Sequence, residues 1–579
     1  MTLDETTRLR LLTAPDGAFP VTEIVVDGVR LEMFDRDPRT MRDAFLATRA
    51  HRNRTAVVYG EERWTYEDQW QEVVALAHAL RDELGVRKGD RVGLAMRNYP
   101  EFLFTFWATQ LLGAVLVPYN GWLRTRELAD LIAGSGPVVL VADRERVALL
   151  AEEDLTAAGV RAVIGVRAED ATATATATER GRNAVIAYAD LVRRAGHPAE
   201  PPAEEVLPED PATILYTSGT TGKPKGALHR HRNHSASLLN KLIRAVRVVP
   251  ATATEPLQVL PPAPSTKLMT FPMFHIAGMN TLYTAAYSGH TLVLMYKWNA
   301  ELAVELIERE AANEIAGPPF VIQTFLDAAA TTERDLGSLR IIGMGGSAAS
   351  LQVVDAIRER FGDQITPRTG YGLTETTSGV LSIPAGDFAR HPDSVGRTLP
   401  TVQVAILGED GRSLPTGEVG EIAICGPQVV SGYFDVPDAE DFRDGWFHTG
   451  DLGRIDEEGL VYITGRLKDV VIRGGENIYC AEVEAALNAH PDLLEAAAFG
   501  APHAALGEEL VAVARVRPGS SVEPEELRTF AAERLAAFKV PARIAIVDAE
   551  LPRTPSGKIV KRDIATTLDV TDLLNPVDA

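Results

Sequence analysis

The sequence predicts an α/β fold: a large amino-terminal region of parallel-type sheets flanked by helices, followed by a small mobile α+β domain. Three observations support this prediction. The 579 residues exceed what one hydrophobic core usually serves. Residues 89–118 alternate strand, helix and strand, the unit of a parallel sheet covered by helices. Residues beyond 469 alternate short strands and helices over about 110 residues, which is enough for a separate domain.

Apolar and β-branched runs place the individual elements. In the first part of the chain we expect a strand at 55–59, a helix at 67–84, a turn and buried strand at 89–96, a helix at 101–112, and strands at 114–118 and 138–141. Further on we expect strands at 212–215 and 339–342, a helix at 351–361, a strand with a glycine turn at 469–479, a helix at 481–489, strands at 494–499 and 510–516, and a helix at 524–538. The Ala-Thr repeat at 171–178 has no apolar face to bury and predicts a mobile surface insertion without a functional role.

The composition, 45% hydrophobic and 24% charged, is typical of a soluble globular protein. A net charge of −22 argues against a general nucleic-acid binder, because phosphate backbones require a basic face. No apolar run approaches a membrane span, and the first eight residues lack the order of a secretory signal, so we expect a cytoplasmic location. Cys425 and Cys480 lack neighbours at metal-binding spacing and indicate neither a disulfide nor a zinc site.

The stretch YTSGTTGKPKG at 216–226 follows the predicted strand at 212–215. Glycines let backbone N–H groups approach a ligand, and hydroxyl and ammonium groups donate to anionic oxygens, so the stretch predicts a phosphate-binding loop. It differs from the P-loop, because two residues separate Gly219 and Gly222 and Pro224 follows Lys223. The candidate phosphate contacts are Thr217, Ser218, Gly219, Thr220, Thr221, Gly222 and Lys223.

This loop and five later segments, in the same order, resemble the motifs of the adenylate-forming superfamily, which contains acyl-CoA synthetases, aryl-CoA ligases, luciferases and peptide-synthetase adenylation domains. The later segments lie at 271–279, 339–348, 369–376, 445–469 and 551–559. The chain is most similar to a fatty or aryl acyl-CoA synthetase. The resemblance implies an adenylation domain at 1–467 and a lid domain at 468–579, with the hinge at Lys468.

Two of these segments imply walls of the substrate pocket. In similar enzymes an aromatic-His-x-x-Gly segment borders the carboxylate pocket, so His275 is expected to line it; core packing is the alternative for a lone histidine. The glycine turn at 343–348 also satisfies a relaxed dinucleotide fingerprint. The resemblance instead implies a wall of the adenine and acyl pockets, contributed by Gly345, Gly346 and Ser347.

The next segments imply nucleotide contacts. The resemblance places Tyr371 and Gly372 against adenine, Thr374 at phosphate and Glu375 at Mg²⁺. A hard dication prefers carboxylate oxygen, although a solvated acid at a helix start is the alternative for Glu375. The carboxylate of Asp451 can accept two hydrogen bonds from the ribose hydroxyls, with Arg466 as a second polar contact.

The carboxy-terminal segments supply the remaining candidates. The resemblance identifies Lys558, on a Pro/Ser/Gly loop, as the adenylation lysine. It implies that the turn of Arg473, Gly474 and Gly475 moves over the site for the second half-reaction. The predicted catalytic residues are Lys558, Thr217, Glu375 and His275.

Three histidines lie within HRHRNH at 229–234. A metal site is one interpretation, but no carboxylate or cysteine accompanies them, and residues two apart on a helix point to different faces. We therefore expect a polar helix start here.

The resemblance implies an ATP-dependent acid–CoA ligase that forms an acyl-adenylate with release of pyrophosphate and then an acyl-CoA thioester. It uses ATP, Mg²⁺ and coenzyme A, and we expect a role in fatty acid metabolism and a possible homodimer. Met273, Met279 and nearby aromatics indicate an acid with an apolar tail or ring. Apolar residues separate Lys539 and Arg543, which grip coenzyme A in some relatives, so the acceptor's phosphates are held elsewhere or weakly.

Two alternatives remain open at this point. The first is an adenylating enzyme of the same superfamily that uses an amine or a carrier-protein thiol as acceptor, or that adenylates another oxyacid. The second is a non-catalytic nucleotide-binding regulator, against which the presence of both Lys558 and Glu375 argues.

Overall fold

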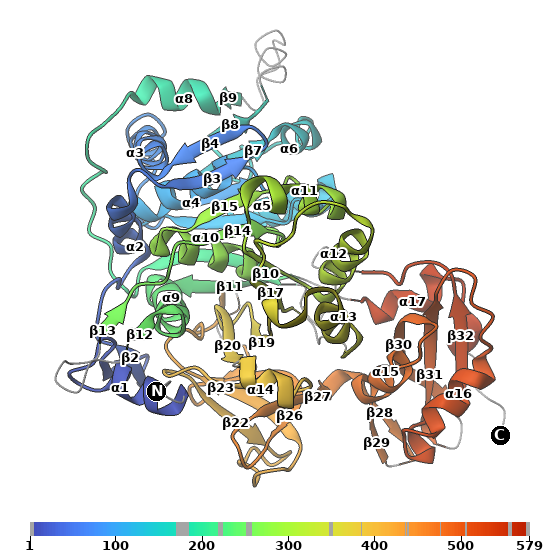
Figure 1. Ribbon diagram of the computed structural model, residues 1–579. Coiled ribbons are helices and arrows are strands. Elements are labelled where there is room, and N and C mark those ends of the chain that lie inside the picture. The colour runs from blue at the N-terminus through green and yellow to red at the C-terminus, as the bar shows by residue number, and fades with distance from the viewer. Residues whose placement is uncertain are drawn as a thin grey trace.

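The computed structural model describes residues 5–168, 185–217, 224–249, 258–346, 351–383, 385–434, 436, 439–474, 476–503, 506–553 and 559–574. Two large sheets with helices around them form the amino-terminal region, and a smaller α+β domain lies beside it (Figure 1). This arrangement confirms the predicted fold class. The Ala-Thr repeat at 171–178 lies outside the described residues.

The first sheet has eight strands. Their order is β24 (Tyr433–Phe434), β11 (Lys225–Arg230), β10 (Pro211–Thr217), β6 (Val115–Tyr119), β5 (Arg91–Ala95), β7 (Val139–Asp143), β8 (Ala162–Val166) and β9 (Val185–Ala187). Neighbours from β10 to β9 are parallel, whereas β11 pairs antiparallel with β10 and with β24. The strands that sequence periodicity predicts at 89–96, 114–118 and 138–141 are present as β5, β6 and β7.

The second sheet has seven strands. Their order is β18 (Thr366–Arg368), β17 (Ile341–Met344), β16 (Glu314–Gly317), β14 (Thr266–Met269), β15 (Thr291–Leu294), β3 (Thr55–Tyr59) and β4 (Glu62–Thr65). Only the β3–β4 pair is antiparallel. The carboxyl ends of β14, β16, β17 and β18 therefore meet at one edge of the sheet, where ligands bind in open α/β sheets.

Helices join and cover the sheets. They are α1 (Glu5–Thr13), α2 (Met41–Ala47), α3 (Tyr66–Asp82), α4 (Pro100–Leu111), α5 (Thr125–Ser135), α6 (Arg144–Leu149), α8 (Tyr188–Ala195), α9 (His231–Ala245), α10 (Ile276–Ser288), α11 (Ala300–Glu310), α12 (Pro319–Thr331), α13 (Leu351–Phe361) and α14 (Ala385–Arg390). Thr65 begins α3 with a capping box in which its side chain accepts from the backbone of Asp68. One apolar cluster combines α2, α3, α4, α9 and α10 with strands of both sheets, so these helices form the core between the sheets.

The chain then forms β-rich structure below the two sheets in the view of Figure 1. One sheet is the antiparallel group β19 (Gly370–Leu373), β20 (Ser378–Ser382) and β21 (Arg397–Thr398). A second contains β22 (Gln403–Leu407), β23 (Gly420–Cys425), β25 (Phe442–Arg443), β26 (Trp446–Ile455) and β27 (Val461–Arg466). Two short pairs, β1 (Val21–Val26) with β2 (Val29–Phe34) and β12 (Arg247–Val249) with β13 (Gln258–Leu260), complete this region.

The small domain has its own sheet and core. Strands β29 (Glu476–Tyr479), β28 (Val470–Arg473), β31 (Gly507–Val516), β30 (Leu493–His503) and β32 (Arg543–Val547) pack with α15 (Cys480–Asn488), α16 (Pro524–Ala532) and α17 (Lys561–Thr567). The predicted helix at 524–538 is too long. Helix α16 ends at Ala532, and Ala536 takes an extended backbone (ψ 147°) that turns the chain toward Pro541.

The histidine-rich stretch corrects a second expectation. A helix does start here, because α9 begins at His231, but His229 in β11, His231 and His234 are all fully buried rather than forming a solvated polar start. Each ring has a partner: His229 contacts the carbonyl of Thr374 (2.8 Å), the backbone N–H of Met41 donates to His231 (3.1 Å), and His234 lies 2.9 Å from the hydroxyl of Thr213. Among the residues that the structure describes, no group of three or more His, Cys, Asp or Glu side chains is placed to hold a metal ion.

These buried histidines predict a pH dependence of stability. Burial lowers the pKa of His229 to about 4 and that of His231 to about 3. The unfolded chain therefore binds protons near pH 6.5 that the folded protein does not, and the free energy of unfolding falls as the pH drops from 7 toward 4. Urea unfolding at pH 7 and pH 5 is expected to differ by about 2 kcal/mol for each of these histidines. A His231→Gln variant should lose less stability over this range, and equal losses in variant and parent would contradict the account.

None of the described helices is both long enough and apolar enough to span a membrane. Cys425 and Cys480 are both buried free cysteines.

Candidate active site

A cavity of about 1460 Å³ runs along the seven-stranded sheet and reaches the β-rich region below it. Residues at or just beyond the carboxyl ends of the parallel strands line one side: Thr270 and Phe271 after β14, Pro318 after β16, Gly345 after β17 and Thr369 after β18. Parallel pairing brings these ends together, because each strand points the same way. The cavity is therefore a consequence of the sheet topology.

The glycines after β17 leave the cavity wall open. A Cβ atom built on Gly345 or Gly346 would meet no heavy atom within 4 Å, and Gly346 has a φ of +87°. A ligand can therefore approach this backbone closely, which fits the predicted pocket wall. Ser347 lies outside the described residues.

The predicted phosphate-binding loop begins in the same cavity. Thr217, the last residue of β10, lines the cavity, and its hydroxyl donates to the carbonyl of Lys225 (3.4 Å) across the β10–β11 pair. The Lys225 ammonium lies 2.8 Å from the Asp441 carboxylate and 4.8 Å from the centre of the Tyr433 ring. Residues Ser218, Gly219, Thr220, Thr221, Gly222 and Lys223 lie outside the described part of the chain.

Thr374 and Glu375 also line the cavity, directly after β19. Glu375 is buried, with 8% of its surface exposed, and its carboxylate accepts a hydrogen bond from the Tyr433 hydroxyl (3.0 Å). Burial and the charges of Glu375 and Asp441 raise the pKa of Tyr433, so this hydroxyl stays protonated and donates. A buried, oriented carboxylate beside hydroxyls and a lysine is a donor set that fits Mg²⁺ and phosphate oxygens.

Tyr371 and Arg466 line the cavity, and the buried carboxylate of Asp451 contacts both of them. The Tyr371 hydroxyl donates to Oδ2 of Asp451 (2.6 Å), and Nε of Arg466 lies 2.7 Å from Oδ1. Asp451 and Arg466 face each other across the β26–β27 pair, so neighbouring strands position both side chains. The structure thus brings together three residues that are separated by up to 95 positions (466 − 371).

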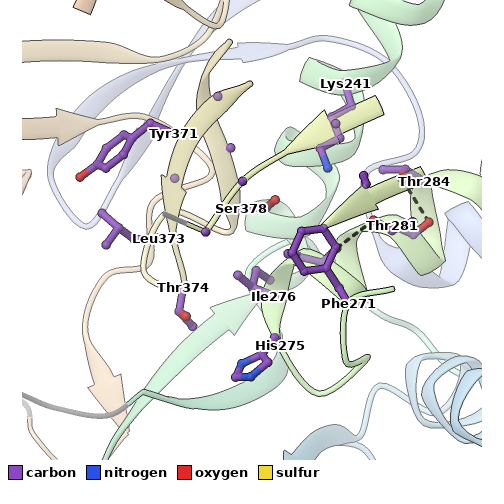
Figure 2. Close-up of a pocket in the computed structure, with 18 of the residues that line it drawn as sticks. Lys241, Phe271, His275, Ile276, Thr281, Thr284, Tyr371, Leu373, Thr374 and Ser378 are labelled. Carbon is purple, nitrogen blue, oxygen red and sulfur yellow. Dashed lines mark hydrogen bonds between the residues drawn. The ribbon is translucent and has the colours of Figure 1, made fainter. Parts of the chain in front are cut away.

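His275 lines the cavity at the amino end of α10, after the turn that carries Phe271. Figure 2 shows His275 near Thr374, with the apolar side chains of Phe271 and Ile276 further into the pocket. The half-buried imidazole thus lies in the pocket wall, as expected for a residue that borders a substrate, rather than wholly within the core.

The small domain reaches the cavity at two places. Lys468, between β27 and β28, lines it, and burial together with the Arg466 guanidinium lowers the pKa of Lys468. The guanidinium of Arg553 lies 5.7 Å from the ring centre of Phe320, which also lines the cavity. The segment that carries Lys558 therefore begins beside the cavity, although Lys558 itself is outside the described residues.

Other candidates in the small domain do not line the cavity in this arrangement. Arg473 ends β28 and Gly474 follows it in an exposed turn, whereas Gly475 is outside the described residues. Lys539 is ion-paired with Glu482 (2.7 Å), and Arg543 donates to backbone carbonyls of Asp572 and Leu573. Both cations therefore already have partners within their own domain.

Several site residues have no sequence signal. Tyr433 and Asp441 belong to no motif. Tyr433 reaches Glu375 from β24, which pairs with β11, and Asp441, just before β25, reaches Lys225 at the start of β11. His229 likewise holds the carbonyl of Thr374 from inside the core. Tyr433 and Glu375 are 58 positions apart, so only the folded structure shows that these two residues meet.

Gly372 offers a direct test of how the site is built. A Cβ atom at this position would lie 2.0 Å from the carbonyl oxygen of Ser378, so the close β19–β20 pairing requires glycine. Gly372→Ala is expected to lower the free energy of unfolding by about 2 kcal/mol or more and to displace Tyr371 and Thr374.

Gly345→Ala is the matched variant. Its methyl group enters the cavity instead, so the KM for ATP should rise without loss of stability. Urea unfolding and pyrophosphate-release kinetics measure both; equal stability of the two variants would contradict this account.

Two family models match different parts of the chain. The family model described as AMP-binding enzyme matches residues 45–434, and that of the AMP-binding enzyme C-terminal domain matches residues 482–558. A feruloyl-CoA synthase from Amycolatopsis sp is 33% identical over 514 residues, covering 88% of this chain and 95% of the relative. An indoleacetate–CoA ligase from Aromatoleum aromaticum is 32% identical over 514 residues, covering 88% and 94%. The crystal structure of ATP-bound MatB from Rhodopseudomonas palustris aligns with a TM-score of 0.78 at 27% identity, covering 92% of this chain and all of that one.

Proposed function

Because this chain belongs to the AMP-binding enzyme family, we propose that it is an ATP-dependent carboxylic acid–CoA ligase. It joins an acid to a thiol in two steps, through an acyl-adenylate. The two relatives described above, each at about a third identity over nearly its whole length, are CoA ligases. An acceptor other than coenzyme A is the less favoured alternative.

One observation supports this function above the others: candidate groups for both reactants share a single cavity. We assign the polyphosphate of the nucleotide to Thr217, Thr374 and Glu375, and its adenosine to Tyr371 and Arg466, all of which line this cavity. Asp451 contacts both Tyr371 and Arg466 and is assigned to the ribose. His275 and the apolar wall continue the same space toward an acid. A nucleotide and a carboxylate can therefore meet without leaving the cavity.

In the first step an oxygen of the acid forms a bond to the α-phosphorus of ATP, and the bond from that phosphorus to pyrophosphate breaks. The acid is already ionised at neutral pH, so this step needs no general base. The two anions repel each other, and cations with oriented donors have to offset that repulsion. We assign this role to Lys558, Lys223 and the hydroxyl of Thr217, while Mg²⁺ held by Glu375 would supply further positive charge.

In the second step the thiol of coenzyme A attacks the acyl carbonyl, and AMP leaves with the bonding electrons. The thiol needs the space that Lys558 occupies in the first step. We propose that residues 468–579 rotate about Lys468, which withdraws Lys558 and brings Arg473, Gly474 and Gly475 over the site. Lys468 suits a hinge, because the short segment Leu467–Asp469 joins β27 of the large region to β28 of the small domain.

Further parts of the proposal rest on sequence alone. They are the apolar tail or ring of the acid, a role in fatty acid metabolism, a cytoplasmic location and a homodimer. The involvement of Mg²⁺ rests on the resemblance and on the donor set around Glu375.

The proposed function is tested by pyrophosphate release across a panel of aliphatic and aromatic acids, with and without coenzyme A. We expect acid-dependent release from ATP and formation of a thioester when coenzyme A is present. Release without a thioester would identify coenzyme A as the wrong acceptor. No release with any acid would refute the ligase assignment.

A further inference from the structure

The cavity has a second, charged end that the adenylation chemistry does not use. Lys267 lies near the amino end of β14 and Glu314 begins β16, and both line the cavity. The chemistry described above takes place at the carboxyl ends of the same strands. With about 3.3 Å per residue, the three residues from Lys267 to Thr270 separate the two ends by about 10 Å.

Lys241, on α9, projects into this charged end. Figure 2 shows its ammonium group directed between Ser378 and Thr284, on the far side of Phe271 and Ile276 from His275. Among the described residues Lys241 forms no hydrogen bond and no ion pair, whereas the nearby carboxylate of Glu314 is already paired with Lys267 (2.7 Å). The wall thus presents a half-buried cation without a partner among the described residues, which is unfavourable unless a ligand supplies one.

The other charged groups at this end increase the positive excess. Arg244 and Arg8 share the single carboxylate of Glu5 (3.9 and 3.3 Å), and Arg368 lines the cavity from β18. Burial lowers the pKa of His290, before β15, to about 4, so this imidazole is neutral. Cations therefore outnumber carboxylates here, although the whole chain carries a net charge of −22.

We propose that the acid activated by this enzyme carries a second anionic group, a carboxylate, which pairs with Lys241 at the far end of the cavity. This inference rests on the proposed function and narrows its substrate class. The reacting carboxylate lies near His275 and Thr374, an apolar chain or ring packs between Phe271 and Ile276, and the distal carboxylate lies at Lys241. An apolar middle of this kind agrees with the tail or ring that the sequence indicates.

The KM for a dicarboxylate is expected to depend on pH through the charge of Lys241. Burial, with a contribution from Lys267, lowers the pKa of Lys241 to about 8, and Glu314 partly opposes the shift. Lys241 is thus largely protonated at pH 7 and loses its charge above about pH 8. The KM for a dicarboxylate should rise through that range, whereas the KM for a monocarboxylate of equal length should not follow it.

The test compares α,ω-dicarboxylates with monocarboxylates of the same length, by pyrophosphate release from the full-length enzyme. We expect the parent enzyme to favour the dicarboxylate, and Lys241→Met to lower the ratio of the two kcat/KM values by about 30-fold or more, mainly through KM. Lys241→Arg should restore most of the preference. The ratio is taken within one variant, so partial misfolding does not affect it.

Lys297→Met is the matched control, because it removes a lysine from the exposed rim of the same cavity. It should leave the ratio near that of the parent enzyme. A parent enzyme that prefers monocarboxylates, a Lys241→Met variant with an unchanged ratio, or equal activity toward a distal amide would each overturn the inference. In all three cases pyrophosphate is still released, so the outcome is distinct from failure of the ligase assignment, in which no acid gives release.

Discussion

Replacing Lys558 with alanine is expected to slow acid-dependent pyrophosphate release by about 10²- to 10³-fold. The lysine is expected to lie between carboxylate and phosphate as negative charge develops at phosphorus. Its segment begins beside the cavity, because Arg553 contacts the ring of Phe320. Thioester formation from supplied acyl-adenylate should change by no more than about threefold, since the second step withdraws this residue.

Rapid-quench assays of the two half-reactions measure both effects. Arg562→Ala is the control, because it removes an exposed positive charge from the same part of the chain. The control should retain both half-reactions. Equal losses in the two half-reactions of Lys558→Ala would contradict the proposal that the small domain takes a different position in each step.

Glu375→Gln is expected to lower kcat/KM by about 10²-fold and to raise the Mg²⁺ concentration needed for half-maximal rate. Glutamine retains the shape and can still accept from Tyr433, so the variant removes the charge while keeping the packing. The neutral amide is a poorer ligand for a hard dication.

Tyr433→Phe is the matched variant for Glu375. It removes the hydrogen bond at 3.0 Å but leaves the carboxylate, so we expect a smaller loss with an unchanged Mg²⁺ requirement. Titration of the rate with Mg²⁺ separates the two variants. A Glu375→Gln enzyme with the parent's rate and Mg²⁺ dependence would show that this carboxylate does not hold the metal.

Local sequence patterns predict most of the framework. The β-branched run at 55–59 forms β3, and the amphipathic runs at 67–84 and 351–361 form α3 and α13, because each buries one face against the sheets. The motif residues converge from three separate sheets. Thr217 ends β10, Gly345 follows β17 and Thr374 follows β19, so the packing of the sheets against one another brings them to one cavity.

The remaining features depend on long-range packing, which a linear pattern does not contain. The charged end of the cavity forms only because α9 places Lys241 close to Lys267 and Glu314. Likewise, the polar residues of 229–234 predict a polar helix start, and α9 does begin at His231, but the core surrounds all three histidines and supplies their partners. Side-chain burial of this kind is decided by neighbours distant in sequence.

The central claim is that a carboxylate oxygen attacks the α-phosphorus of ATP. Turnover of an acid labelled with ¹⁸O in its reacting carboxylate tests it most directly, with mass spectrometry of every product. The account predicts one ¹⁸O in AMP, one in the thioester and none in pyrophosphate. Label in inorganic phosphate together with formation of ADP, or AMP without label, would contradict it.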